Sequence, residues 1–431
     1  MGIGDRPTPQ VEGNAATTSL LDLPQELVNQ ILSELTESNP GPYRFRFEDA
    51  EPSFNTKRVN QGLSTMAKLC RTSRALHDLV EPLLYEFVYI PEATAKPLTS
   101  LLRCWKSRPH CAGYTRRLTI ETKWVPGGTP PQTIPAEDVA FVSDVAKKLR
   151  VYLRETWNEY TWNTDILVEL AMFQARRVQS VELEFCQLRG IYRPAFECLL
   201  PEHGDTKHVS FDHLEYLYLV QAGWRIAELD HVLDRAPNLA KLRLFMCDFN
   251  YPSQTLPESL TSLCILRCPI TPSRLESVIR GMEKLTRIEF TIWRGQPEDL
   301  ASVIAALSKH SRTLKSLTVC FGWNRRSGTS RVKVPLDTLT GLESLTTDVR
   351  SFGLGPTGLV QSLPPSLRKL RLIRSPETTK EELELFASEV AEAKKWGLED
   401  LTVVSSGPEY WEELDSSHDT VFDYKAMSLQ E

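Results

Sequence analysis

Short segments with the pattern L-x-x-L-x-L, in which other apolar residues replace some leucines, recur along the chain. From position 214 onward they begin at residues 214, 239, 260, 285, 314, 342, 367 and 398, at intervals of 21 to 31 residues. An earlier copy begins at 178, and degenerate copies occur at 87 and 116. Alternation of apolar and other residues over so short a length predicts β-strands with one buried face.

Helical patterns separate several of these predicted strands. Apolar residues recur at three- and four-residue steps in the segments 225–236, 272–282, 297–310 and 380–396. Two of these segments begin with a proline, a residue that suits the first turn of a helix. The chain therefore predicts an alternation of strand and helix that is repeated many times.

Three copies extend the pattern to L-x-x-L-x-L-x-x-C-x-L, with Cys186, Cys247 and Cys268 at the cysteine position. This pattern and the repeat length resemble those of leucine-rich repeats. The resemblance implies an α/β fold: a curved solenoid over residues 86–407, with strands on its concave face and helices on its convex face. It gives the cysteines a structural role, the satisfaction of backbone groups after each strand. We interpret residues 136–177 as a helical insertion between repeats.

The segment 20–35, LLDLPQELVNQILSEL, predicts an amphipathic helix. Leu23, Leu27, Ile31 and Leu35 recur every four residues, and Val28 and Leu32 widen the apolar stripe. Residues 36–62 contain Pro, Gly, Asn and charges and predict a loop, after which a second amphipathic segment runs from residue 63 to 80. So small a helical unit cannot bury all of this apolar surface, which implies a partner or a neighbouring domain.

These two segments resemble an F-box, over residues 20 to about 90. The resemblance rests on LPQELVNQIL and on the Cys-Arg-x-x-Arg-like step at residues 70–74, although the loop 36–62 is longer than in most of the family. It implies a helical domain over residues 20–85 that binds a Skp-type adaptor and, through it, a cullin–RING ubiquitin ligase. The implied adaptor-binding residues are Leu23, Pro24, Leu27, Val28, Ile31, Leu35, Leu69, Cys70, Ser73 and Leu76. The alternative, that the first helix packs on the rest of its own chain, stays open.

The residues between the leucines of each strand face away from the predicted core, because side chains alternate along a strand. Aromatic and arginine side chains among them are of the type enriched at binding hot spots. The basic segment 323–334 is a further candidate binding site for an acidic or phosphorylated target, although such a run is more often a solvated loop. The predicted target-binding residues are Tyr216, Tyr218, Lys241, Arg243, Phe245, Arg287, Arg325 and Arg326.

Charge, apolar runs and cysteine content exclude several classes of protein. The 431 residues carry a net charge of -6, which argues against a dedicated nucleic-acid-binding protein. No apolar run approaches the roughly 18 residues of a membrane span, so no membrane partner is expected. Nine cysteines without a secretory signal indicate reduced thiols in the cytoplasm or nucleus. Residues 1–19 are expected to be disordered, and residues 408–431 form an acidic tail whose Trp411 and Phe422 are candidates for capping the last repeat.

No catalytic or metal-binding motif stands out. His203, His208 and His213 are five residues apart, which matches no standard zinc spacing. The chain has no P-loop, no H-E-x-x-H and no G-x-S-x-G. We therefore expect a non-catalytic protein without metal or cofactor. The F-box resemblance implies that it is a substrate-recognition subunit of an SCF-type ligase, whose target is unknown. The rival hypothesis is a leucine-rich-repeat scaffold that acts in a stable assembly without ubiquitination.

Overall fold

The structure is a computed structural model of the 431-residue chain. It describes most of residues 23–32, 56–121, 134–153, 163–184, 209–220, 226–247, 256–292, 297–321, 335–348, 362–374 and 397–405, together with 385, 388, 421 and 422. The chain divides into two compact units, which are described separately below. Unit 1 comprises residues 1–44 and 54–84, and unit 2 comprises residues 45–53 and 85–431.

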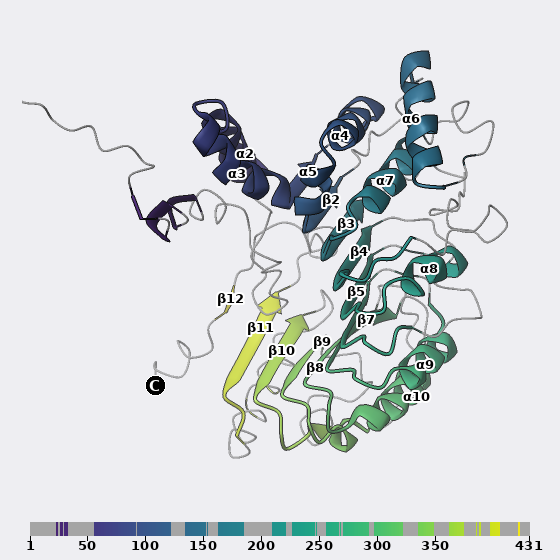
Figure 1. The fold of residues 1–431 in the computed structure, drawn as a ribbon. Helices are drawn as coiled ribbons and strands as arrows, with labels where there is room; N and C mark the ends of the chain where they lie inside the picture. Colours follow the sequence, from purple (N-terminus) through teal and green to yellow (C-terminus); the bar gives the residue numbers. More distant parts are fainter. Residues whose placement is uncertain are drawn as a thin grey trace, which may run out of the picture. The chain divides into compact units, whose positions relative to one another are not determined.

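Unit 1 is helical. The described residues from 26 to 32 are helical and are followed along the chain by α2 (Thr56–Leu69) and α3 (Arg74–Glu86) (Figure 1). Val28, Leu32, Met66 and Val80 form a small buried core. The loop prediction for 36–62 is wrong at its end, because α2 already begins at Thr56. The second amphipathic segment is divided between α2 and α3, because the helix breaks at residues 70–73.

Unit 2 is built on one sheet of twelve strands whose order in space is their order in the sequence (Figure 1). Among the described strands, β1 to β11 are parallel to their neighbours, and β12 is antiparallel to β11. The strands are β1 (Phe87–Ile90), β2 (Arg117–Ile120), β3 (Ser180–Glu184), β4 (Tyr216–Val220), β5 (Lys241–Phe245), β6 (Ser262–Leu266), β7 (Arg287–Ile292), β8 (Ser316–Phe321), β9 (Ser344–Asp348), β10 (Lys369–Arg374), β11 (Asp400–Ser405) and β12 (Val421–Phe422). Each L-x-x-L-x-L copy named above, including those at 87 and 116, coincides with one strand, so the strand predictions are confirmed.

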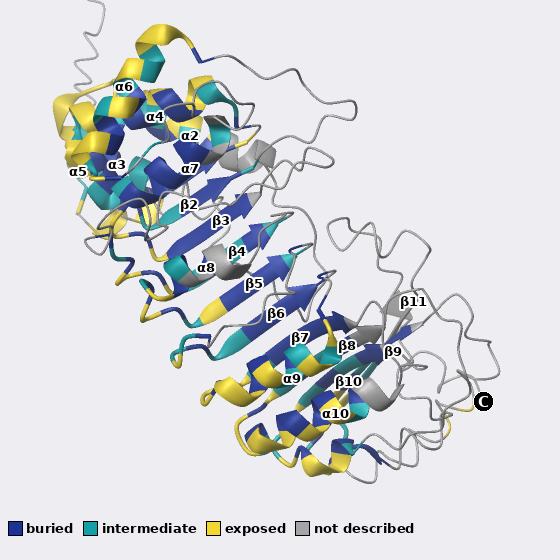
Figure 2. Cartoon of the chain, turned by 90° about the vertical axis from the view of Figure 1, so that its right-hand side faces the viewer, coloured by how far each residue is buried: buried dark blue, intermediate teal, exposed yellow. Residues whose placement is uncertain are grey.

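Helices connect several of the parallel strands, as parallel pairing requires a crossover. They are α4 (Ala95–Ser107), α5 (Pro109–Tyr114), α6 (Ala136–Lys148), α7 (Asn163–Gln174), α8 (Ile226–Leu233), α9 (Pro272–Gly281) and α10 (Pro297–Leu307), with short 3-10 turns η4 (Ser308–His310) and η5 (Leu336–Thr338). Pro272 opens α9, and the Thr271 hydroxyl accepts a hydrogen bond from the Arg274 amide at 3.4 Å. Figure 2 shows exposed residues on the outer sides of α9 and α10 and buried residues toward the strands.

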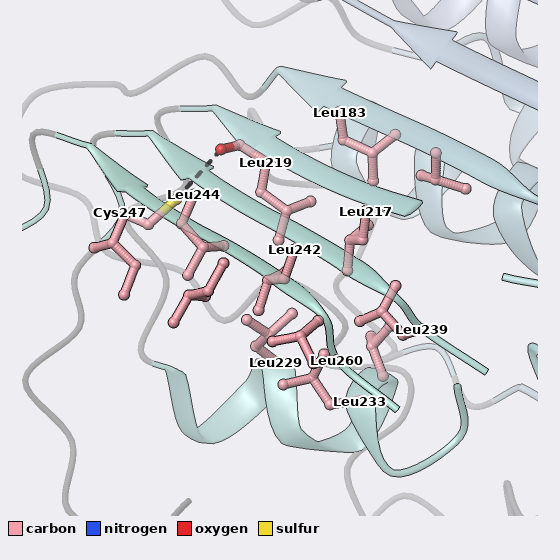
Figure 3. Close-up of a cluster of buried hydrophobic side chains, with 14 of the residues drawn as sticks. Leu183, Leu217, Leu219, Leu229, Leu233, Leu239, Leu242, Leu244, Cys247 and Leu260 are labelled. Carbon is pink, nitrogen blue, oxygen red and sulfur yellow. Dashed lines mark hydrogen bonds between the residues drawn. The ribbon is translucent and has the colours of Figure 1, made fainter. Parts of the chain in front are cut away.

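One continuous apolar core joins the strands to these helices. The second and fourth residues of β1 to β8 and of β10 enter it, as Leu217 and Leu219 of β4 and Leu242 and Leu244 of β5 illustrate (Figure 3). The helices α4, α6, α7, α8, α9 and α10 contribute buried side chains to the same core. In the described part of unit 2 the helices therefore pack against one face of the sheet. We call the opposite face, which holds the first and third residues of each strand, the helix-free face.

Two cysteines link successive strands through their thiols. Cys247 Sγ lies 3.6 Å from the Leu219 carbonyl oxygen (Figure 3), and Cys268 Sγ lies 3.6 Å from the carbonyl oxygen of Leu244. The Cys247 amide in turn donates to Cys268 Sγ at 3.3 Å. The predicted structural role is confirmed for these two cysteines, since each satisfies a buried carbonyl of the preceding repeat. Cys186 lies outside the described residues.

This arrangement predicts that Cys268→Ala lowers the free energy of unfolding by about 1–3 kcal/mol, because it removes a buried donor and leaves carbonyl groups unsatisfied. Cys268→Ser keeps a donor at the same position and should lose less. Urea unfolding followed by circular dichroism measures both variants. Equal losses in the alanine and serine variants would assign the effect to the lost sulfur volume instead of the hydrogen bonds.

Candidate interaction surfaces

The first surface is a pair of apolar side chains on the first helix of unit 1. The amides of Leu27 and Val28 donate to the Pro24 carbonyl at 3.0 and 3.1 Å, which starts the helix at this proline. Helical geometry then separates two faces of the apolar stripe. Val28 and Leu32 are 2% and 1% exposed in the core of the unit, whereas Leu27 and Ile31 are 46% and 41% exposed.

This exposure is unusual within the chain. Among the described residues, the exposed large hydrophobic side chains are Leu27, Ile31 and Leu385. Leu27 and Ile31 are one helical turn apart, so they form a continuous apolar surface, while Leu385 lies in unit 2. An apolar pair that its own unit leaves uncovered is a candidate site for a partner.

The other predicted adaptor-binding residues differ in how far their side chains are buried. The assignment of Val28 to the binding surface is wrong, because its side chain is core. Leu23, Leu69 and Cys70 are half-buried against the same core, Leu76 is half-buried, and Pro24 and Ser73 are exposed. Leu35 lies outside the described residues. Ser73 has a structural function as well, because its hydroxyl accepts a hydrogen bond from the Leu76 amide at 3.2 Å and caps α3.

The second surface is the helix-free face of the sheet. Strand register aligns the third residues of neighbouring strands, so that Glu182, Tyr218, Arg243, Cys264 and Glu289 form one continuous row. Neighbouring strands are about 4.8 Å apart, which brings each of these side chains within contact distance of the next. The row crosses β3 to β7.

Among the described lysine and arginine residues of the helix-free face, Arg243 is the least exposed. Its guanidinium carbon lies 4.7 Å from the centroid of the Tyr218 ring, a cation–π contact, and the residue is only 9% exposed. Tyr216 lies two residues before Tyr218 on β4, and burial raises the pKa of its hydroxyl, with further contributions from Glu182 and Arg243 of opposite sign. The Tyr218 ring thus covers one side of the buried arginine.

Glu289 is a buried carboxyl group whose pKa is influenced by several arginine residues. The residue is 5% exposed, and burial raises its pKa from 4.5 to about 7, although the charges of Arg243, Arg287 and Arg371 and a hydrogen bond from Cys264 act in the opposite direction. Its Oε2 atom makes no hydrogen bond within the described part of the chain. We call Arg243, Cys264, Arg287, Glu289 and Arg371 the arginine–glutamate cluster.

Arg371 belongs to this cluster although it lies on a distant strand. Its strand, β10, is three strand positions from β7, or roughly 14 Å at ordinary spacing. The side chains between them on the helix-free face are small, namely Ser316 and Thr318 on β8 and Ser344 and Thr346 on β9. Because these residues are short, the long arginine side chain has room to extend toward Glu289.

The charge of the helix-free face is nearly balanced. At the first, third and fifth positions of β1 to β11, six residues are basic and five are acidic. The basic residues are Arg117, Lys241, Arg243, Arg287, Lys369 and Arg371, and the acidic ones are Glu182, Glu184, Glu289, Asp348 and Asp400.

The structure brings most of the predicted target-binding residues together. Tyr216, Tyr218, Lys241, Arg243, Phe245 and Arg287 all lie on the helix-free face, within four neighbouring strands. Arg325 and Arg326 lie outside the described residues. The prediction omitted Cys264, Glu289 and Arg371 as site residues. Alignment of the third position of every strand would have found the first two, whereas the reach of Arg371 depends on the small residues beside it.

Other expectations concern metals and membranes. His213 and Asp212 are exposed, and Ser210 hydrogen-bonds to Asp212, while His203 and His208 lie outside the described residues. The absence of a metal site there stays a prediction. No helix in the described ranges combines the length and the apolar character of a membrane span.

Comparison with known proteins adds little beyond these features. The chain matches no protein-family model and no curated protein. Among solved structures it is similar to the leucine-rich repeat-containing protein LegL7 from Legionella pneumophila, at 14% identity and a TM-score of 0.35, over 55% of this chain and 89% of that one. The fold assignment therefore rests on the strand order, register and core described above.

The raised pKa of Glu289 predicts a pH-dependent stability. Between pH 4.5 and about 7 the folded state holds a proton that the unfolded state has already released, so the free energy of unfolding falls as pH rises through this window. Glu289→Gln cannot ionise and should exceed the wild type in stability by on the order of 1–3 kcal/mol at pH 8, with the gap closing near pH 4.5.

Chemical denaturation at several pH values measures this difference. Glu283→Gln is the matched control, because Glu283 is exposed in the segment before β7 and its substitution makes the same change in charge. A glutamine variant at 289 that is less stable than the wild type at pH 8 would show that the arginine contacts outweigh the cost of burying the carboxylate.

Proposed function

We propose that this chain is the target-binding subunit of an SCF-type ubiquitin ligase. In this proposal unit 1 binds a Skp-type adaptor, and the helix-free face of unit 2 binds the protein to be ubiquitinated. The chain itself carries no catalytic step. It raises the effective concentration of target lysines near the conjugating enzyme, because it holds both in one assembly.

The observation that carries the proposal is the exposure of Leu27 and Ile31. Full burial of an exposed side chain of this size contributes roughly 1.5–3 kcal/mol. Because Leu27 and Ile31 are 46% and 41% exposed, a partner that covers them gains about half of that for each residue. The core of the unit is formed by Val28 and Leu32 on another face of the same helix, so partner binding does not require the unit to unfold. The F-box resemblance of the segment 20–90 supplies the identity of the partner.

The repeat architecture supports the second half of the proposal. Solenoids of strand–helix repeats present extended surfaces on which proteins bind, and they serve as interaction scaffolds. In unit 2 the helix-free face offers aromatic side chains and a buried arginine. These are features of protein-binding surfaces, and nothing about them requires chemistry by this chain.

The test is a pull-down of the full-length protein with a purified Skp-type adaptor. Leu27→Asp/Ile31→Asp should reduce binding by at least 100-fold, because two buried apolar contacts become charged. Both positions are exposed, so the variant should keep the thermal unfolding profile of the wild type. Leu385→Asp, which places a charge at the exposed leucine of unit 2, is the matched control and should bind like the wild type.

Two outcomes contradict the proposal. One is a folded wild type that does not bind the adaptor, and the other is a double variant that binds as tightly as the wild type. A protein that binds the adaptor, but whose co-purified partners do not accumulate when it is removed from cells, would instead support the non-degradative assembly.

A further inference from the structure

The outer edge of β11, the last of the parallel strands, is covered over only part of its length by the described strands. β11 has six residues, but β12 pairs with two of them, with Val403 opposite Phe422 and Val404 opposite Val421 (Figure 1). The edge of a strand presents N–H and C=O groups that need partners and that attract another strand. The first residues of β11 can therefore accept a longer strand than β12.

The apolar core is also less complete at β11 than at the strands before it. Leu401 of β11 is half-buried against the core. Its register partner Leu370 on β10 is 1% exposed, and Leu345, the next residue in the same row, is fully buried on β9. A strand placed beside Leu401 would remove this remaining apolar surface from water, which favours its binding.

We propose that the chain covers this edge itself, and that residues 421–425, VFDYK, form one antiparallel strand along β11. Residues 423–431 follow β12 in the sequence and lie outside the described residues. The register of β12, extended by three residues, gives three further pairs, namely Asp423 with Thr402, Tyr424 with Leu401 and Lys425 with Asp400. This inference concerns neither the adaptor nor the target, so it does not depend on the proposed function.

The sequence of this segment matches the two faces of β11. Aromatic and charged residues alternate in Phe422, Asp423, Tyr424 and Lys425, a pattern typical of a strand with one apolar face. In the extended register the two aromatic residues lie opposite the fourth and second residues of β11, which are the core positions in β1 to β8 and β10. Directly opposed residues share a face of the sheet, so the aromatic residues extend the core and the charged ones lie on the helix-free face.

Charge favours the same register. Asp400 is exposed at the start of β11, and the extended register places Lys425 directly opposite. Opposite charges at directly opposed positions stabilise a pair of strands. A shift of the register by one residue would bring Tyr424 or Ala426 to this position and would turn the aromatic residues away from the core face.

The first experiment measures hydrogen–deuterium exchange of the full-length protein by mass spectrometry, in peptides that cover residues 398–405. Val421→Pro/Phe422→Pro should lower the protection of these peptides roughly tenfold, because successive amides point to opposite sides of a strand and proline donates no hydrogen bond. Ser428→Pro/Leu429→Pro is the matched control beyond the proposed strand and should exchange like the wild type. Peptides from β5 should keep their protection in every variant, which shows that the repeats remain folded.

A charge swap tests the register. Lys425→Asp places two carboxylates opposite each other and should lower the protection of the same peptides about fivefold. Asp400→Lys alone should act in the same direction, and Asp400→Lys/Lys425→Asp should return the protection to the wild-type value because it restores opposite charges. Glu399→Lys/Lys425→Asp is the matched control. Glu399 is exposed and adjacent to β11, but its side chain alternates to the other face, so this variant should not recover protection.

The proposal is overturned if the double proline variant leaves the protection of residues 398–405 unchanged, or if the charge swap recovers no more protection than the Glu399 control. A second copy of the chain is the alternative occupant of the β11 edge. A wild type that elutes as a dimer in size-exclusion chromatography, with a protection of β11 that rises with protein concentration and is independent of residues 421–425, would identify that occupant and also overturn the proposal.

Discussion

The in-register alignment of parallel strands is the constraint on which the rest of unit 2 depends. Each strand must place its second and fourth residues in the core, because helices cover that face alone in the described part of the sheet. Its first and third residues then lie on the opposite face. Register converts a repeat in the sequence into rows in space, so that residues 25 positions apart, such as Tyr218 and Arg243, become neighbours.

The same constraint explains why charged residues become buried without entering the apolar core. Long side chains that stand about 4.8 Å apart on one face cover each other. Arg243 is enclosed by Tyr218 on one side and by Cys264 and Glu289 on the other. A charge in this position is shielded from water, and its neighbours must supply the compensation that water would have given.

Most of the fold could be predicted because each repeat carries its own strand signal. The L-x-x-L-x-L copies located the strands from β1 to β11, and alternation assigned Arg243 and Arg287 to the correct face. The role of each residue in the first helix was harder to predict, because its apolar stripe includes both a buried face and an exposed face. Only the packing of Met66 and Val80 against Val28 and Leu32 shows which part of the stripe is core and which part, Leu27 and Ile31, is left exposed. The Glu289 site could not be found from one repeat, since its members come from four strands and Arg371 lies three strands away from Glu289.

The two surfaces differ in the kind of binding that their chemistry favours. Apolar contact at Leu27 and Ile31 is nearly independent of direction and of pH, and it suits a partner that stays bound. Charge contacts on the helix-free face depend on geometry, salt and protonation, and they discriminate among partners more than they add affinity. The burial of Glu289 costs the fold stability at neutral pH, since its environment opposes ionisation.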